Sequence, residues 1–134
     1  MTSNGFEVSL YIPKQHLLAT QAHMVVAPGV DGYFGILSLH SPVVSLLKPG
    51  LLKVHVDQQT VMKYVISYGV ARINDNKFAL MVEDAILLDN INTVLANQSI
   101  DAYQKDLSLS SSLTQKQNLS KKIDFLKACV ELRK

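Results

Sequence analysis

The stretch "GYFGILSLHSPVVSLLKPG", residues 32–50, decides how this sequence is interpreted. It sets three glycines, two prolines and a histidine among apolar residues, in a chain of 134 residues with only six glycines and four prolines. A loop of this composition suits a catalytic pocket, a cradle for a phosphate or the rim of a protein interface. The sequence on either side of it is needed to choose among them.

Short β-strands are predicted on both sides of this stretch. In "FEVSLYI", residues 6–12, apolar side chains occupy every second position, which is the period of a half-buried strand. Similar runs bounded by turn residues cover residues 21–27, 51–56, 60–67 and 77–83. Many short strands without helical patterns between them favour an antiparallel β-sandwich or barrel.

The pattern changes near Asn92, because no glycine or proline follows and apolar residues recur at helical spacing. Two stripes have steps of four, three and four: Ala96, Ile100, Tyr103 and Leu107, then Leu119, Ile123, Leu126 and Val130. Ser112 and Gln115 form the S-x-x-Q pattern of a capping box, so the second helix is predicted to begin there. The predicted fold class is mainly β with an α appendage. An antiparallel β-sandwich over residues 1–91 is followed by an antiparallel two-helix hairpin over residues 92–134.

Composition and charge exclude several classes of protein. The chain is 48% hydrophobic and 18% charged, so it can bury a core. A net charge of +2 is too small to indicate nucleic-acid binding. The single cysteine, Cys129, cannot form an internal disulfide. We expect no secretory signal and no direct membrane insertion, since no run approaches the roughly 18 apolar residues of a spanning helix.

Signals for catalysis or for a cofactor are weak. There is no G-x-x-x-x-G-K-[ST] and no G-x-S-x-G, and the four histidines are never spaced as H-x-x-x-H. His40 stands beside Ser41 and Pro42, where a histidine that ties a loop by hydrogen bonds is favoured over a catalytic base. We expect no enzymatic activity of the chain's own, no metal site and no cofactor.

The quoted stretch, with "GVARI" and "FALMVEDAI" further along, resembles the epsilon subunit of bacterial F-type ATP synthases, the equivalent of the mitochondrial delta subunit. The family's pattern runs approximately G-x-F-G-x-L-P-G-H-x-P-x-x-x-x-L-K-P-G. The chain matches it at Gly32, Phe34, Gly35, Leu37, His40, Pro42, Leu47, Lys48, Pro49 and Gly50. It departs from the family at Ser38-Leu39, where Pro-Gly is usual, and at Tyr68-Gly69, where Gly-Gly is common.

The resemblance implies a noncatalytic rotor subunit of the central stalk. As a peripheral part of the ATP synthase, it would lie at the cytoplasmic face of the bacterial plasma membrane. The sandwich would contact the gamma subunit and the c-ring, so that proton flow through the ring is coupled to the catalytic head. The residues expected at that contact are Asp31, Gly32, Tyr33, Phe34 and His40.

In the family that the chain resembles, the hairpin can fold against the sandwich or extend along gamma into the alpha/beta hexamer. There its basic face meets acidic residues and inhibits ATP hydrolysis. The residues expected to make this inhibitory contact are Lys121, Lys122, Lys127 and Arg133. Members that bind ATP carry a pattern like I/L-D-x-x-R-A, which here reads "INTVLA", residues 91–96. Neutral Asn92 and apolar Leu95 cannot supply the charge-assisted bonds of that pattern, which argues against direct ATP sensing through it.

Two other hypotheses remain at this point. A free-standing β-sandwich interaction module with a helical dimerisation tail explains the two halves of the chain but not the quoted stretch. A small enzyme that uses His40 with a carboxylate is supported only by proximity in sequence. Co-purification with a gamma-like subunit separates the rotor hypothesis from the dimeric module.

Overall fold

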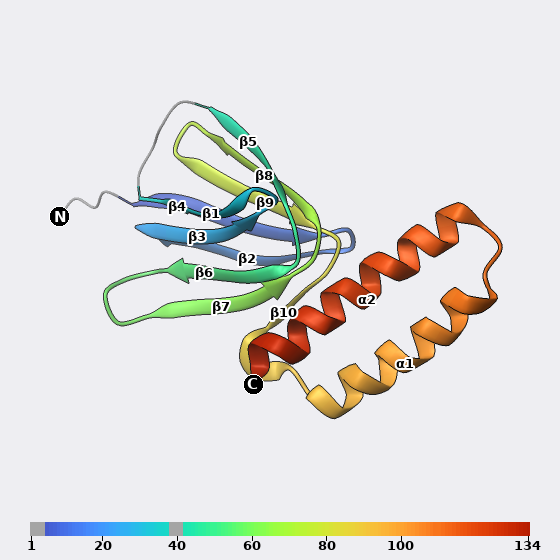
Figure 1. Cartoon of the computed structure of the whole chain (residues 1–134). Coiled ribbons are helices and arrows are strands. Elements are labelled where there is room, and N and C mark those ends of the chain that lie inside the picture. The colour runs from blue at the N-terminus through green and yellow to red at the C-terminus, as the bar shows by residue number, and fades with distance from the viewer. Residues whose placement is uncertain (1–4, 38–41) are drawn as a thin grey trace.

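The computed structural model describes residues 5–37 and 42–134 (Figure 1). Strands occupy the first two-thirds of this part of the chain, and two helices follow them (Figure 1). The elements are β1 (Phe6–Ile12), β2 (Gln15–Ala22), β3 (Met24–Gly29), β4 (Gly32–Ile36), β5 (Val43–Leu47), β6 (Gly50–His55), β7 (Val61–Ile66), β8 (Gly69–Asn74), β9 (Lys77–Val82), β10 (Ala85–Leu87), a 3₁₀ turn η1 (Leu88–Asn90), α1 (Thr93–Leu109) and α2 (Leu113–Arg133).

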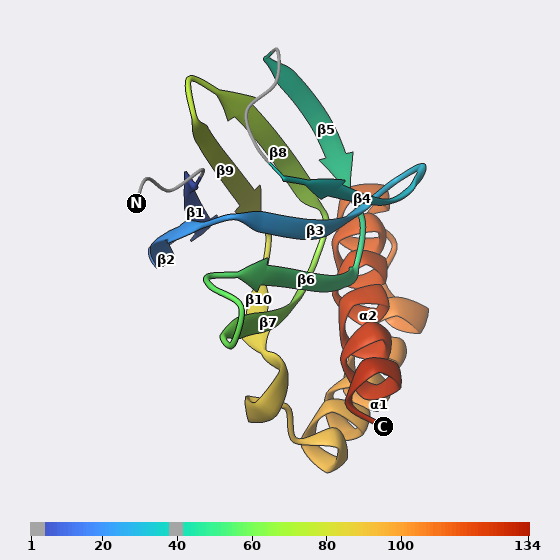
Figure 2. The same ribbon diagram turned by 90° about the vertical axis from the view of Figure 1, so that its left-hand side faces the viewer.

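The strands form one continuous hydrogen-bonded sheet that curls on itself (Figure 2). Its order is β10-β7-β6-β3-β5-β8-β9-β1-β2, and β4 pairs with β3 outside this path. The curled sheet and the two helices after it confirm the predicted fold class. Neighbouring strands are antiparallel except β1 and β9, which run parallel. A parallel pair needs a long connection, and here most of the sheet lies between the two strands in sequence.

Residues 32–50 differ from the sequence-based expectation of a loop, because most of them form strands. β4 returns from β3 through a two-residue turn, and Gly32 takes a φ of +128° that favours glycine there. β5 pairs with β8 along its whole length. Neither segment alternates clearly in sequence, so their strand conformation comes from pairing with partners distant along the chain.

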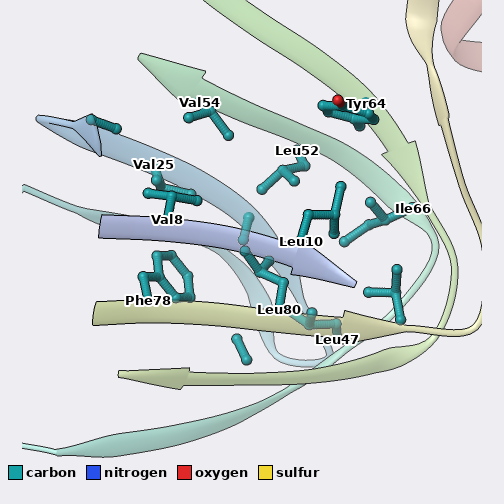
Figure 3. Close-up of a cluster of buried hydrophobic side chains, with 14 of the residues drawn as sticks. Val8, Leu10, Val25, Leu47, Leu52, Val54, Tyr64, Ile66, Phe78 and Leu80 are labelled. Atoms are coloured by element: carbon teal, nitrogen blue, oxygen red, sulfur yellow. The ribbon is translucent and has the colours of Figure 1, made fainter. Parts of the chain in front are cut away.

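Alternate residues of the strands point into the curled sheet and form the main hydrophobic core (Figure 3). Val8 and Leu10 of β1 are fully buried, as are Leu52 of β6 and Leu80 of β9. This confirms the period of two in residues 6–12, whose apolar positions face inward while Glu7 and Tyr11 face outward. Every residue of this buried core belongs to a strand, so the core needs no side chain from the helices.

The two helices form an antiparallel hairpin at one end of the sheet, with α2 between the sheet and α1 (Figures 1 and 2). Asn92 caps α1, and Ser112 caps α2 by accepting a hydrogen bond from the Gln115 amide at 3.2 Å, so the predicted start of the second helix is confirmed.

The predicted stripes, each with two buried members, are confirmed. The sequence pattern missed Phe125 and Cys129, which α2 buries on a second face with Val65 and Ile91. A helix between two layers needs two apolar faces, and a single stripe describes only one of them.

Candidate functional site

The turn between β3 and β4 carries four of the five residues expected to contact partners. Asp31 is exposed at the turn, and Tyr33 is 56% exposed. The Tyr33 hydroxyl accepts a hydrogen bond from the Leu51 amide at 3.0 Å, which ties β4 to β6. Phe34 is half-buried and packs against the main core. The structure therefore gathers Asp31, Gly32, Tyr33 and Phe34, whereas His40 lies outside the described residues.

The outer face of the sheet carries a row of apolar side chains that the sequence-based predictions did not include. Register places Leu46 of β5 beside Val70 of β8, Val70 beside Met81 of β9, and Met81 beside Tyr11 of β1. We call these four residues the outer apolar stripe. Leu46 is 59% exposed, Met81 42% and Tyr11 37%.

The stripe runs across four strands; its Tyr11 ring stacks on the His16 ring, with the centroids 4.2 Å apart, while Leu46 and Met81 are exposed. Contiguous apolar surface of this kind marks a protein contact more often than scattered exposed residues do. A sequence signal for it exists in "VVSLL" of β5, where apolar residues occupy both faces of the strand. Its extension over β8, β9 and β1 could be found only from the pairing of the strands.

The hairpin contacts the sheet through a second, smaller hydrophobic cluster. Phe125 and Cys129 of α2 pack with Val65 of β7 and with Ile91, which lies just before α1. Burial raises the pKa of the Cys129 thiol to about 11, with a further contribution from the Asp84 carboxylate. The buried thiol is therefore a packing residue and not a reactive nucleophile.

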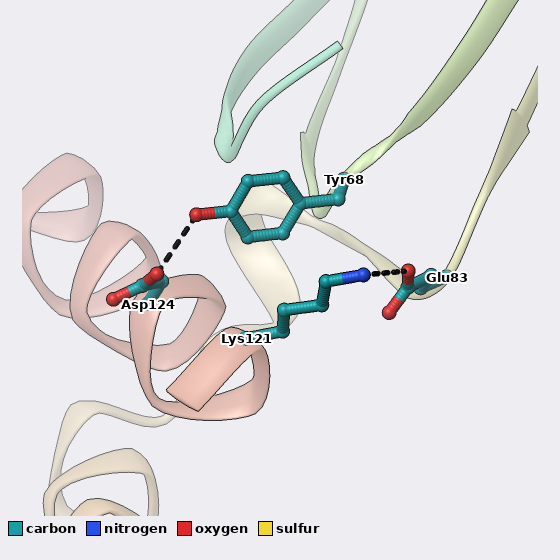
Figure 4. Close-up of polar contacts among 4 residues, drawn as sticks. All are labelled: Tyr68, Glu83, Lys121 and Asp124. Carbon is teal, nitrogen blue, oxygen red and sulfur yellow. Dashed lines mark hydrogen bonds and ion pairs between the residues drawn. The ribbon is translucent and has the colours of Figure 1, made fainter. Parts of the chain in front are cut away.

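Two polar contacts lie beside this cluster, and we call them the docking contacts (Figure 4). The Tyr68 hydroxyl donates to Asp124 Oδ2 at 2.8 Å, and Lys121 Nζ lies 3.3 Å from Glu83 Oε2. The Lys121 ammonium also lies 5.7 Å from the centroid of the Tyr68 ring. The hydrogen bond to Asp124, with burial and nearby carboxylates, raises the pKa of Tyr68, so the phenol stays neutral and can donate. Each docking contact joins the sandwich to α2.

The four basic residues expected to make an inhibitory contact are differently engaged. Lys121 is held by Glu83, Lys122 Nζ lies 5.4 Å from the Tyr103 ring centroid, and Arg133 lies 3.9 Å from Asp89. Lys127 makes no hydrogen bond or ion pair with the described residues. Three of the four cations thus contact the chain's own groups, and their role toward a partner stays a prediction.

The start of α1, residues 91–96, is organised by a helix cap. Asn92 Oδ1 accepts a hydrogen bond from the Leu95 amide at 3.1 Å, and the Leu95 side chain is 58% exposed. The side-chain oxygen of Asn92 is therefore used to satisfy the first turn of the helix.

A metal site and a membrane-spanning helix each require a particular arrangement of the described residues. No group of three His, Cys, Asp or Glu side chains within residues 5–37 and 42–134 is arranged to hold a metal ion. None of the helices described is both long and apolar enough to cross a membrane.

The fold places this chain among proteins in which a curled β-sandwich is followed by a helical hairpin. Comparison with known proteins finds the same β-sandwich domain. The model of the ATP synthase delta/epsilon chain β-sandwich domain matches residues 5–88, which is most of the chain. The chain therefore belongs to the ATP synthase delta/epsilon chain family, as the sequence motifs predicted.

Two relatives illustrate the match in sequence. The ATP synthase epsilon chain of Rhodospirillum centenum is 28% identical over 135 residues, covering 97% of this chain and 92% of the relative. That of Rickettsia bellii is 31% identical over 107 residues, covering 78% of this chain and 99% of the relative. Both alignments extend beyond the sandwich into the helices.

Two solved structures share the fold. One is a chain in the Euglena gracilis mitochondrial ATP synthase, with OSCP, F1 and c-ring in rotational state 1. It has a TM-score of 0.72 and 19% identity, over 94% of this chain and 79% of that one. The other belongs to the central stalk and c-ring of the Tetrahymena thermophila mitochondrial ATP synthase. It has a TM-score of 0.61 and 14% identity, over 96% of both chains. At these identities the match supports the fold alone.

Proposed function

We propose that this chain is a noncatalytic rotor subunit in the central stalk of an F-type ATP synthase, peripheral to the cytoplasmic face of a bacterial membrane. It binds the gamma subunit through the outer apolar stripe and the c-ring through the turn of Asp31, Gly32, Tyr33 and Phe34. The single observation that carries the proposal is the stripe, since four strands jointly present apolar side chains on one face and Leu46 and Met81 among them are 59% and 42% exposed. Membership of the ATP synthase delta/epsilon chain family supports the choice of these partners.

The arrangement suits transmission of torque. The turn and the stripe lie on one hydrogen-bonded sheet, so a force applied at the turn passes to the stripe through strand pairing and a packed core. Neither contact requires a reacting group, which agrees with a subunit that does no chemistry of its own.

Co-expression with the gamma subunit encoded in the same genome tests this function. We expect a stable complex, and we expect Leu46→Lys to weaken it by about 30-fold or more, because the change removes an apolar contact and leaves a charge without a partner. The affinity is measured by biolayer interferometry with immobilised gamma. Val61→Lys is the control, since Val61 on β7 is 37% exposed but lies outside the stripe.

Two results would contradict the proposal. One is unchanged gamma binding by the Leu46→Lys variant. The other is a chain that elutes alone as a stable dimer beside its own gamma subunit, which would favour the free-standing module.

We further propose that the hairpin regulates ATP hydrolysis by leaving the sandwich and presenting Lys121, Lys122, Lys127 and Arg133 to acidic groups of the alpha/beta hexamer. Its support is the separation of the two hydrophobic clusters, since the main core contains no helical residue. A domain with its own core can release a neighbour without unfolding.

Deleting residues 92–134 should therefore leave a folded sandwich and, in the assembled enzyme, raise ATP hydrolysis about fivefold or more. Cooperative urea unfolding checks the first expectation and a coupled ATPase assay the second. A truncated chain that unfolds, or an unchanged rate of hydrolysis, would count against a regulatory hairpin.

A further inference from the structure

We infer that Glu83 and Tyr68 on the sandwich hold the hairpin in its docked position, and that Glu83 competes with any acidic partner for Lys121. This rests on the proposed function only where it concerns the alpha/beta hexamer. The docking contacts themselves are a property of the free chain.

The docking contacts lie on the same side of α2 as the residues that it buries against the sheet. Asp124 lies three positions after Lys121, and Phe125 lies four positions after it. Cys129 follows four positions after Phe125. Residues at this spacing share one face of a helix. The sheet-facing side of α2 is thus apolar at Phe125 and Cys129 and polar one turn earlier, where it meets Tyr68 and Glu83.

Tyr68 makes its contact from the position just before β8. Its phenol reaches Asp124 of α2 at 2.8 Å. A hydrogen bond to a carboxylate is stronger than one between neutral groups. Tyr68 therefore forms a direct tie between the sandwich and the hairpin.

Glu83 and an external carboxylate would compete for the same ammonium group, that of Lys121. The Glu83 carboxylate holds the Lys121 ammonium at 3.3 Å, and the two side chains are 53% and 45% exposed. A pair this exposed is weak and is screened by salt, so an external carboxylate can replace Glu83. Glu83 thus occupies, within the chain, the place that an acidic partner surface would take.

Cys129 provides a direct measurement of docking. It is the chain's single cysteine, it is 2% exposed, and it lies in the cluster that joins α2 to the sheet. An aromatic disulfide such as DTNB can reach the thiol only after the hairpin opens, so the labelling rate at fixed pH is proportional to the opening equilibrium.

We expect Tyr68→Phe to raise the labelling rate about tenfold, since it removes a hydrogen bond to a charged group. Glu83→Gln should raise it about threefold at low salt, and by less at 1 M salt. Matched controls are Thr20→Val, which removes a hydroxyl hydrogen bond on β2, and Glu7→Gln, which removes an exposed carboxylate on β1. Both controls should label at the rate of the parent chain.

Local opening must be separated from general destabilisation. Amide hydrogen exchange in β8 and β9, which belong to the main core, should be the same in the Tyr68→Phe and parent chains. Parent-like labelling of Tyr68→Phe, or faster exchange in β8 and β9 to the same degree as the faster labelling, would overturn the role of Tyr68.

The competition is tested with a poly-glutamate peptide of about 20 residues as an acidic probe. Glu83→Gln should bind it about threefold more tightly than the parent chain at low salt, and Glu7→Gln should bind it as the parent does. Equal affinities for all three chains would overturn the competition. Both readouts use the free chain, so a failure to bind gamma would refute the proposed function without touching this inference.

Discussion

Replacing Phe78 with alanine is expected to lower the free energy of unfolding by about 4 kcal/mol, because the change removes a buried ring and leaves a cavity. Phe78 is 1% exposed on β9, and its ring centroid lies 6.5 Å from that of Phe6. Strand pairing places Phe78 beside Val8 of β1 and beside Ile73 of β8, so removing the ring takes packing contacts from three strands. Urea unfolding followed by circular dichroism measures the change.

Met81→Ala is the matched control for Phe78→Ala. Met81 lies three residues further along the same strand but faces outward and is 42% exposed. Its truncation should cost less than about 1 kcal/mol, because water already covers much of the side chain. Comparable losses for the two variants would show that the main core is not where the structure places it.

Gly69→Ala is expected to lower the free energy of unfolding by about 3 kcal/mol, since it overpacks a site bounded by backbone. A Cβ on Gly69 would overlap the Met81 carbonyl oxygen and lie 2.7 Å from the Val82 Cα. These are atoms of the paired strand β9, which cannot turn aside as a flexible side chain would. The measurement is the same urea titration.

Gly35→Ala is the control, because it measures the effect of a glycine-to-alanine change in a strand where the added Cβ meets no close backbone atom. The nearest atom to a Cβ on Gly35 in β4 is the Val25 carbonyl oxygen at 3.9 Å, which is an ordinary contact. The change should therefore stay within about 0.5 kcal/mol of the parent chain. A Gly69→Ala chain as stable as Gly35→Ala would contradict the close approach of β8 and β9.

Much of the fold could be predicted from local pattern. The alternation in residues 6–12 predicted β1, and the Ser112 to Gln115 spacing predicted the cap of α2, because both depend on residues close together in the chain. β2, β4 and β5 were not predicted as strands. Their sequences alternate poorly, and pairing with distant strands determines their conformation.

The candidate site was predicted only in part. Asp31, Gly32, Tyr33 and Phe34 are neighbours in sequence, so a family motif could mark them, and the structure keeps them at one turn. The outer apolar stripe draws on β5, β8, β9 and β1, and no single segment shows it. The buried face of α2 at Phe125 and Cys129 was missed because the stripe toward α1 already satisfied the helical pattern.

The sequence by itself determined the family of this chain, its division into strands and helices, and the cap that begins the second helix. The tertiary structure alone decided which exposed residues act together. Tyr68 meets Asp124 across 56 positions, and Lys121 meets Glu83 across 38. Periodicity and capping arise between residues a few positions apart. Contacts between the sandwich and α2 depend instead on how the sheet curls and where α2 packs against it.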